Sequence, residues 1–143
     1  MQTVEQLIDK LKELPEFVKD VCENSIEDNN QDIVDLNREQ LRVRGIDMEG
    51  DKLGEYTPYS KKLREEKGLQ TDFIDLRDTG DFQDSIKLKK KDRLKYEFEA
   101  TDPKWEDILQ PRWPDALGLT PDNEEDLTIL VTSILEKQVD NYL

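Results

Sequence analysis

The chain has 143 residues, a formal charge of −14, and 39% charged against 34% hydrophobic residues. This length predicts a single domain over residues 1–143. With no histidine and one cysteine, Cys22, the composition excludes an intramolecular disulfide, a Cys/His zinc site and catalysis by a Ser-His or Cys-His pair.

The negative charge lies at the two ends of the chain. Residues 1–35 and residues 101–143 each hold 10 acids and 3 bases, whereas residues 36–100 hold 15 of each. The acidic excess disfavours adhesion to nucleic acid or anionic lipid, because Lys and Arg drive those contacts. No apolar run approaches the ~20 residues of a membrane helix, and Met1 opens no secretory signal. We therefore expect a soluble protein made in a cytoplasm, without membrane contact.

The N-terminal segment predicts two amphipathic helices. Apolar residues at helical spacing run from Val4 to Leu14, and this helix is expected to stop before Pro15. Proline is tolerated at a first helical position, so Pro15 is expected to open the second helix. Cys22 falls on the apolar side of that helix, and we interpret it as a buried core thiol.

The next segment predicts a loop and a short helix. Residues 45–58 are rich in Gly, Asp and Glu and lack periodicity, which is typical of a loop. A helix is expected over Tyr59 to Lys67, with Ser60 as its cap and Gly68 as its stop.

The pattern changes to period two at Ser85, which predicts a β-hairpin near residues 85–100. The turn is expected around Lys90 to Arg93, and Leu94 is expected on the apolar face of the return strand.

Cross-strand pairing suggests a register for this hairpin. Placing Leu88 opposite Tyr96 sets Lys87 opposite Glu97, so that packing and charge are both satisfied.

Residues 101–120 are interrupted by prolines and are expected to be irregular. Thr120 is a suitable cap for a last helix with Pro121 at its first position. Its expected buried stripe consists of Leu127, Leu130, Val131, Ile134, Leu135 and Val139. The predicted fold class is α+β, with N-terminal helices and a C-terminal helix packed on a small antiparallel sheet that contains the hairpin.

Carboxylates raise two metal hypotheses that the sequence does not favour. Asp47, Glu49 and Asp51 alternate as in a calcium loop, but Lys52 and Pro58 occupy the positions where Gly and a bidentate acid belong.

A second row of acids recurs every third residue at Asp75, Asp78, Asp81 and Asp84. A magnesium-dependent nuclease needs acids that converge from separated elements rather than one row along the chain. We predict no catalytic, cofactor or metal site, and this nuclease remains the least favoured hypothesis.

Three features are candidates for contacts between subunits. In the first interpretation Gly80 only supplies the positive φ of the turn at Thr79-Gly80. In the second, this corner also contacts a neighbouring subunit. The basic residues between Lys87 and Lys95 form a solvated face of the hairpin, a nucleic-acid site, or, as we favour, a surface that docks onto the acidic ends of the next copy. The tryptophans either anchor an interface or cover the sheet edge. The candidate residues are Asp78, Thr79, Gly80, Phe82, Lys87, Lys89, Lys90, Lys91, Arg93, Trp105 and Trp113.

Between Asn37 and Ile86 the chain carries, in order, the motifs N-x-E-Q-L, G-I-D, Y-x-x-Y-S and L-x-D-T-G-x-F-x-x-S-I. This order of motifs resembles small tail-completion, or neck, proteins of tailed bacteriophages. The versions from Bacteroides and crAss-like phages are the most similar, and they share a late L-G-L-T-x-x-N step, here Leu117 to Asn123. The first helices are more acidic than this family's pattern. The matching residues are Asn37, Glu39, Gln40, Leu41, Gly45, Ile46, Asp47, Gly50, Tyr56, Tyr59, Ser60, Lys67, Leu76, Asp78, Thr79, Gly80, Phe82, Ser85 and Ile86.

The resemblance implies a non-enzymatic virion protein that joins head to tail and is assembled in the bacterial cytoplasm. Copies of the chain would form a ring between a portal or adaptor protein and the tail tube or hub. Genomic DNA would pass through the ring without sequence-specific binding, and acidic residues facing the channel would repel its phosphates. The alternative from another class is an acidic, DNA-mimicking inhibitor of a nucleic-acid-binding protein.

Overall fold

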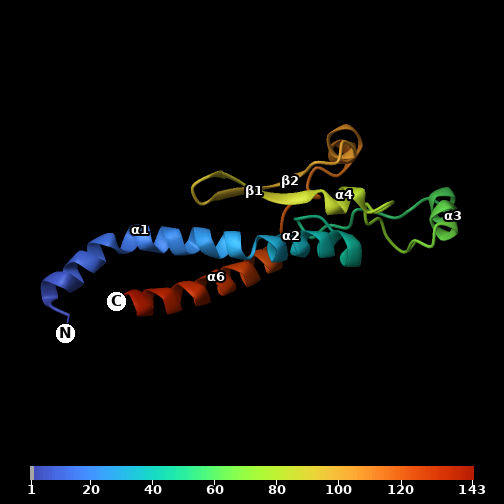
Figure 1. Ribbon diagram of the computed structural model, residues 1–143. Helices are drawn as coiled ribbons and strands as arrows, with labels where there is room; N and C mark the ends of the chain where they lie inside the picture. The colour runs from blue at the N-terminus through green and yellow to red at the C-terminus, as the bar shows by residue number, and fades with distance from the viewer. Residues whose placement is uncertain (1) are drawn as a thin grey trace.

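The computed structural model describes residues 2–143 and shows an elongated α+β protein, as predicted. Two long helices, α1 (Val4–Asp28) and α6 (Pro121–Tyr142), lie side by side as an arm with both chain ends near its tip (Figure 1). A two-stranded hairpin lies along α1, and α3 (Pro58–Glu66) marks the opposite end of the molecule. No helix within residues 2–143 is both long and apolar enough to cross a membrane.

The N-terminal helix is continuous, so the predicted break at Pro15 is wrong. Thr3 caps α1 by accepting a hydrogen bond from the Gln6 backbone N–H at 3.1 Å, and Gln6 Oε1 accepts from the Thr3 N–H at 2.8 Å. An internal proline costs a helix about 3 kcal/mol. Packing of the flanking turns against α6 offsets this cost, because it holds both sides of the proline in one helix. Cys22 is half-buried rather than buried.

A second helical stretch follows directly, with α2 (Asn30–Glu39) leading into a π-helical turn, η1 (Gln40–Arg44). Gly45 ends this turn with a φ of +60°. A Cβ at this position would lie 2.4 Å from Phe73 Cδ2, so both the backbone angle and the close approach require glycine.

The short helix α3 begins one residue earlier than predicted and has a different cap. Thr57, not Ser60, is the cap, and its Oγ1 accepts from the Ser60 N–H at 3.2 Å. Gly68 follows the helix with a φ of +74°, as the prediction of a glycine stop requires. A single helical turn, α4 (Asp81–Asp84), comes just before the hairpin.

The hairpin consists of β1 (Ile86–Asp92) and β2 (Lys95–Ala100), close to the predicted range. The predicted register is wrong by two residues, since Leu88 pairs with Phe98 and Lys87 with Glu99. The turn consists of Arg93 and Leu94, and the ladder before it is irregular between Lys90 and Asp92. A shift of two residues preserves the face of each side chain, so the alternation could not distinguish the two registers.

Leu94 belongs to this turn and not to the apolar face of a strand. Its φ is +58°, and its side chain is 42% exposed. The left-handed backbone closes the hairpin at the cost of an exposed leucine.

The segment after the hairpin is helical over residues 104–112, where the prediction of an irregular segment is wrong, whereas residues 113–120 form no helix, as predicted. It forms a π-helical turn, η2 (Trp105–Leu109), and one turn of α-helix, α5 (Gln110–Arg112). The Trp105 indole stacks on the Phe82 ring with 5.6 Å between centroids. The backbone N–H of Trp113 donates to the Leu109 carbonyl at 2.7 Å. Burial of the Trp105 indole thus holds the segment that contains Pro111 in helical geometry.

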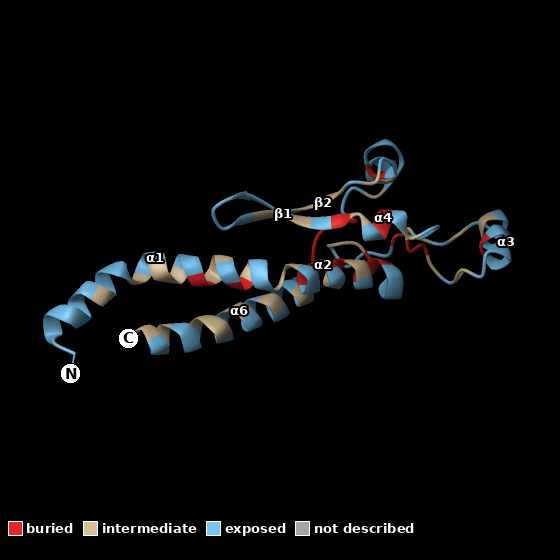
Figure 2. Cartoon of the chain, in the orientation of Figure 1, coloured by how far each residue is buried: buried red, intermediate tan, exposed pale blue. Residues whose placement is uncertain are grey.

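The core is small and lies away from the arm. Buried side chains gather where α2, β1 and α4 meet, whereas α6 has no buried residue (Figure 2). The members of this core are Val34, Leu41, Leu53, Ile74, Phe82, Ile86, Trp105 and Ala116.

A cluster of buried amides joins this core to the start of α6, and we call it the amide clasp: Asn37 and Gln40 with the backbone of Ala116–Thr120. Asn37 Nδ2 donates to the Ala116 carbonyl at 3.0 Å, and its Oδ1 accepts from the Gly118 N–H at 3.0 Å. Gln40 Nε2 donates to the Gly118 carbonyl at 2.9 Å, and its Oε1 accepts from the Thr120 N–H at 2.9 Å. The clasp therefore fixes the residue that caps α6.

The arm itself is thinly packed. The predicted buried stripe of α6 is wrong, because its apolar residues are only half-buried and Leu130 is 42% exposed. The tip of the arm is closed by Tyr142, whose ring stacks on Phe17 with 4.2 Å between centroids. Its hydroxyl donates to the Lys10 carbonyl at 3.1 Å. Two helices alone do not cover each other's apolar faces.

Replacing Asn37 with alanine should destabilise the protein by about 2–4 kcal/mol, because the Ala116 carbonyl and Gly118 N–H lose their partner in a buried position. Urea unfolding monitored by circular dichroism measures this loss. The matched control is Asn24→Ala on the exposed side of α1, for which a change within about 0.5 kcal/mol is expected. Equal stability of the two variants would contradict a structural role for the clasp.

Candidate functional site

The Asp78–Phe82 corner places four of the candidate interface residues around one turn. Gly80 has a φ of +94° and begins α4, as its predicted conformational role requires. Thr79 Oγ1 accepts from the Asp81 N–H at 3.3 Å. Lys67 Nζ donates to Asp78 at 2.8 Å, and this bond lowers the pKa of the Asp78 carboxyl. The corner is thus held by a hydrogen bond within the turn and by the ion pair with Lys67.

A cavity of about 270 Å³ opens at this corner. It brings Asp78, Thr79, Gly80 and Phe82 together with Trp113, which follows them by more than thirty positions in the chain. The rest of the lining is Tyr56, Arg64, Ile74, Leu76, Arg77, Asp81, Lys104 and Leu109. Aromatic and aliphatic side chains thus form the walls of this cavity, and charged residues lie at the same corner.

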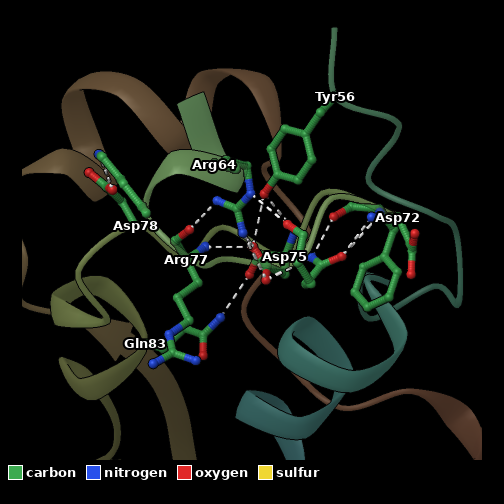
Figure 3. A network of polar contacts seen from close by, with 10 residues as sticks. Tyr56, Arg64, Asp72, Asp75, Arg77, Asp78 and Gln83 are labelled. Carbon is green, nitrogen blue, oxygen red and sulfur yellow. Dashed lines mark hydrogen bonds and ion pairs between the residues drawn. The ribbon is translucent and has the colours of Figure 1, made fainter. Parts of the chain in front are cut away.

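The wall of this cavity rests on a buried carboxylate, Asp75, which is 2% exposed (Figure 3). Tyr56 donates its hydroxyl hydrogen to Oδ1 at 2.9 Å, and the Arg77 N–H donates to the same oxygen at 2.9 Å. Gln70 Nε2 donates to Oδ2 at 2.9 Å. The Asp75 carbonyl accepts from Gln83 Nε2 at 2.8 Å. Asp75 thus joins its own loop to Tyr56 on one side and to Gln83 of α4 on the other.

Arg64 completes this network from α3 and is 9% exposed. Its Nη2 lies 3.2 Å from Asp75 Oδ1 and 3.3 Å from Oδ2, while its Nε donates to the Gln70 carbonyl at 2.8 Å. Nη1 donates to the Arg77 carbonyl. The guanidinium also lies over the Tyr56 ring, 4.3 Å from its centroid. The ion pair ties α3 to the corner.

The carboxylates of the four acids in this row therefore do not converge on one point, although Asp78 and Asp81 both line the cavity. Asp75 is buried against Arg64, Asp78 pairs with Lys67, and Asp84 accepts from Arg38 through its carbonyl at 3.0 Å. Within residues 2–143 no three Asp, Glu, Cys or His side chains are arranged to hold a metal ion.

The basic hairpin forms ion pairs with α1 of its own chain. Lys90 Nζ contacts Glu23, and Arg93 lies 2.8 Å from Glu16 and 2.7 Å from Asp20. The bond to Glu23 raises the pKa of Lys90, and the bond from Arg93 lowers the pKa of the Glu16 carboxyl. The predicted attraction between the hairpin and residues 1–35 is present, but it acts within one copy.

The other candidate bases of the hairpin are arranged differently. Lys91 pairs with Glu99 across the hairpin. Lys87 and Lys89 are exposed and have no ion pair within the described part of the chain. Of the five candidate bases, these two are therefore the ones available to a neighbouring subunit.

The two tryptophans have different surroundings. Trp105 is 7% exposed and belongs to the core, so it offers little surface to a neighbour. Trp113 is half-buried, donates its Nε1 hydrogen to the Leu53 carbonyl at 2.9 Å, and is covered by the Arg112 guanidinium at 4.5 Å from its ring. Trp113 thus lines the corner cavity with one side of its ring engaged.

Sequence reasoning missed the residues that organise this site, namely Arg64, Asp75, Gln70 and Gln83. Their spacing gave no signal, because these side chains resemble solvated surface residues until the fold buries them. Comparison with known proteins gives no further assignment, because no family model, curated protein or solved structure matches this chain.

Replacing Arg64 with alanine should cost about 3–5 kcal/mol of stability, because it leaves the Asp75 carboxylate buried without its charge partner. Urea unfolding measures the loss. Arg77→Ala is the matched control, since the Arg77 side chain is exposed and only its backbone enters the network. Equal stabilities would contradict the role assigned to the ion pair.

Tyr56 should titrate well above the ordinary tyrosine range near 10. Burial, together with its bond to the Asp75 carboxylate, raises the pKa of Tyr56 to about 12. The unfolded chain loses this proton first, so the associated stability is complete below about pH 10 and declines between about pH 10 and 12. The difference between the ultraviolet titrations of wild type and Tyr56→Phe isolates this group. A difference midpoint near 10 would contradict the burial of the hydroxyl.

Proposed function

We propose that this chain is a non-enzymatic structural subunit of a bacteriophage neck. In this role it is a head–tail connector or tail-completion protein that assembles as a ring between portal and tail and leaves a channel for DNA. The observation that carries the proposal is the α1–α6 arm, whose apolar faces are only half covered within one copy. An arm of this kind is completed by other chains, which is what a ring subunit requires.

The internal bonds of the chain support the resemblance on which the proposal rests. The two separate segments that carry it are joined by the amide clasp, because Asn37 and Gln40 of the first bind the backbone at Gly118 and Thr120 of the second. A fold that needs both segments explains why they occur together in order.

The charge of the arm is consistent with a position beside DNA. The exposed surfaces of α1 and α6 are rich in Asp and Glu, and α6 contains Lys137 as its sole base. Phosphate is repelled by such a surface, so DNA moves past it without being held.

The test is to observe assembly directly. We expect the purified protein, alone at rising concentration or after mixing with candidate portal and tail proteins, to form closed rings in electron micrographs. Light scattering should show the matching mass. A chain that stays monomeric with both partners contradicts the proposal. Competition with DNA for a nucleic-acid-binding protein would instead identify it as an acidic inhibitor.

A further inference from the structure

Two surfaces of the chain carry charges that form no ion pair within residues 2–143. The first is the η1 turn, where Arg42 and Arg44 flank Val43. Val43 is 56% exposed, and both arginines are exposed. Neither guanidinium takes part in the ion pairs of the described chain. An apolar residue between two free cations is thus presented to solvent.

This turn is held in a fixed shape. The Gly45 N–H donates to the Leu41 carbonyl at 3.1 Å, and the Ile46 N–H donates to the Gln40 carbonyl at 3.0 Å. Leu41 and Gln40 are fully buried, so the exposed residues of the turn sit on an anchored base. A rigid projection loses little entropy on binding.

The second surface is a cavity of about 480 Å³ between the hairpin, the α1–α2 junction and the start of α6. Glu97 and Glu124 line it, both are exposed, and neither enters an ion pair within residues 2–143. Its apolar walls include Ile33, Leu88, Phe98, Leu119 and Leu127. Glu97 lies opposite Lys89 in the hairpin but does not form an ion pair with it. An apolar hollow beside these two carboxylates complements an apolar residue beside two guanidiniums.

We propose that the η1 turn of one copy docks in this cavity of the next copy. Val43 enters the apolar hollow, and Arg42 and Arg44 pair with Glu97 and Glu124. The cavity exceeds the volume of one valine, so it also accommodates the aliphatic stems of the arginines. This inference rests on the proposed ring, and it names the surfaces through which neighbours meet.

A second copy is the occupant that the charges favour. Both halves of the contact occur on every chain but on different elements, so each copy offers one turn and one cavity. Contacts of this head-to-tail kind close into rings when the rotation between copies allows it. The hairpin bases Lys90 and Arg93 are already paired with α1, whereas Arg42 and Arg44 enter no ion pair within residues 2–143 and flank the exposed Val43 on a turn with a buried base.

Charge reversal tests the contact. Sedimentation velocity is run on the full chain as wild type, as Arg42→Glu/Arg44→Glu and as Glu97→Arg/Glu124→Arg. Each reversed protein should bind its own copies at least about tenfold more weakly, because opposed charges become like charges. An equimolar mixture of the two should recover wild-type association, since each turn then meets a cavity of opposite charge. Lys61→Glu/Lys62→Glu is the control with the same change in net charge, and it should associate as wild type does.

A disulfide trap gives a second readout that does not depend on strong association. In a Cys22→Ser background, Val43→Cys combined with Glu97→Cys should form disulfide-linked copies under mild oxidation at high concentration. Rings that form equally well in all reversed variants, without the cross-link, would overturn this contact while leaving the proposed function standing. Absence of both association and cross-link would also overturn it, and the portal experiment would then decide the proposed function by itself.

Discussion

The amide clasp is the interaction on which the rest of the molecule depends. Asn37 and Gln40 are almost completely buried, yet each carries a donor and an acceptor without a charge. An amide can therefore bind both an N–H and a carbonyl of a distant loop without the desolvation cost of an ion. Gln40 also accepts from Asn123 Nδ2 at 2.8 Å, so it holds the first turn of α6 as well as its cap. These bonds fix the position at which α6 begins relative to the core.

The clasp and the Arg64–Asp75 pair divide the chain into a firm body and an arm. The body combines a small apolar core with buried polar groups that are all hydrogen-bonded within the described residues. Buried ion pairs contribute little net stability, but removing one partner is costly, so they select a single arrangement. The arm has a half-buried seam and ion pairs at its surface. This contrast is what the proposed ring requires, because the body packs within one chain and the apolar faces of the arm are covered when copies assemble.

The sequence predicted those features that depend on local chemistry. Thr120 followed by Pro121 indicated the start of α6, period-two alternation indicated the hairpin, and Gly68 indicated the end of α3. Long-range effects decided the errors. Pro15 remains helical because α6 packs alongside, and the hairpin register is set by a turn at Leu94 whose left-handed backbone no propensity favours.

The candidate site was predictable in part. The corner at Asp78 to Phe82 was recognised from its turn residues, and it does line a cavity. Its support was not, because Arg64 and Asp75 resemble solvated surface charges until the fold buries them together. The partner of the basic hairpin was also hidden, since composition shows that opposite charges attract but not whether they lie on one chain or two.

Amide hydrogen exchange, followed residue by residue in the dilute monomer and in the assembled state, tests this account most directly. The Gly118 and Thr120 amides should exchange only on global unfolding in both states, because both are bound within the clasp. The amides of α6 from Ile129 to Val139 should exchange much faster in the monomer and become protected on assembly. An arm as protected as the clasp in the dilute monomer would contradict it.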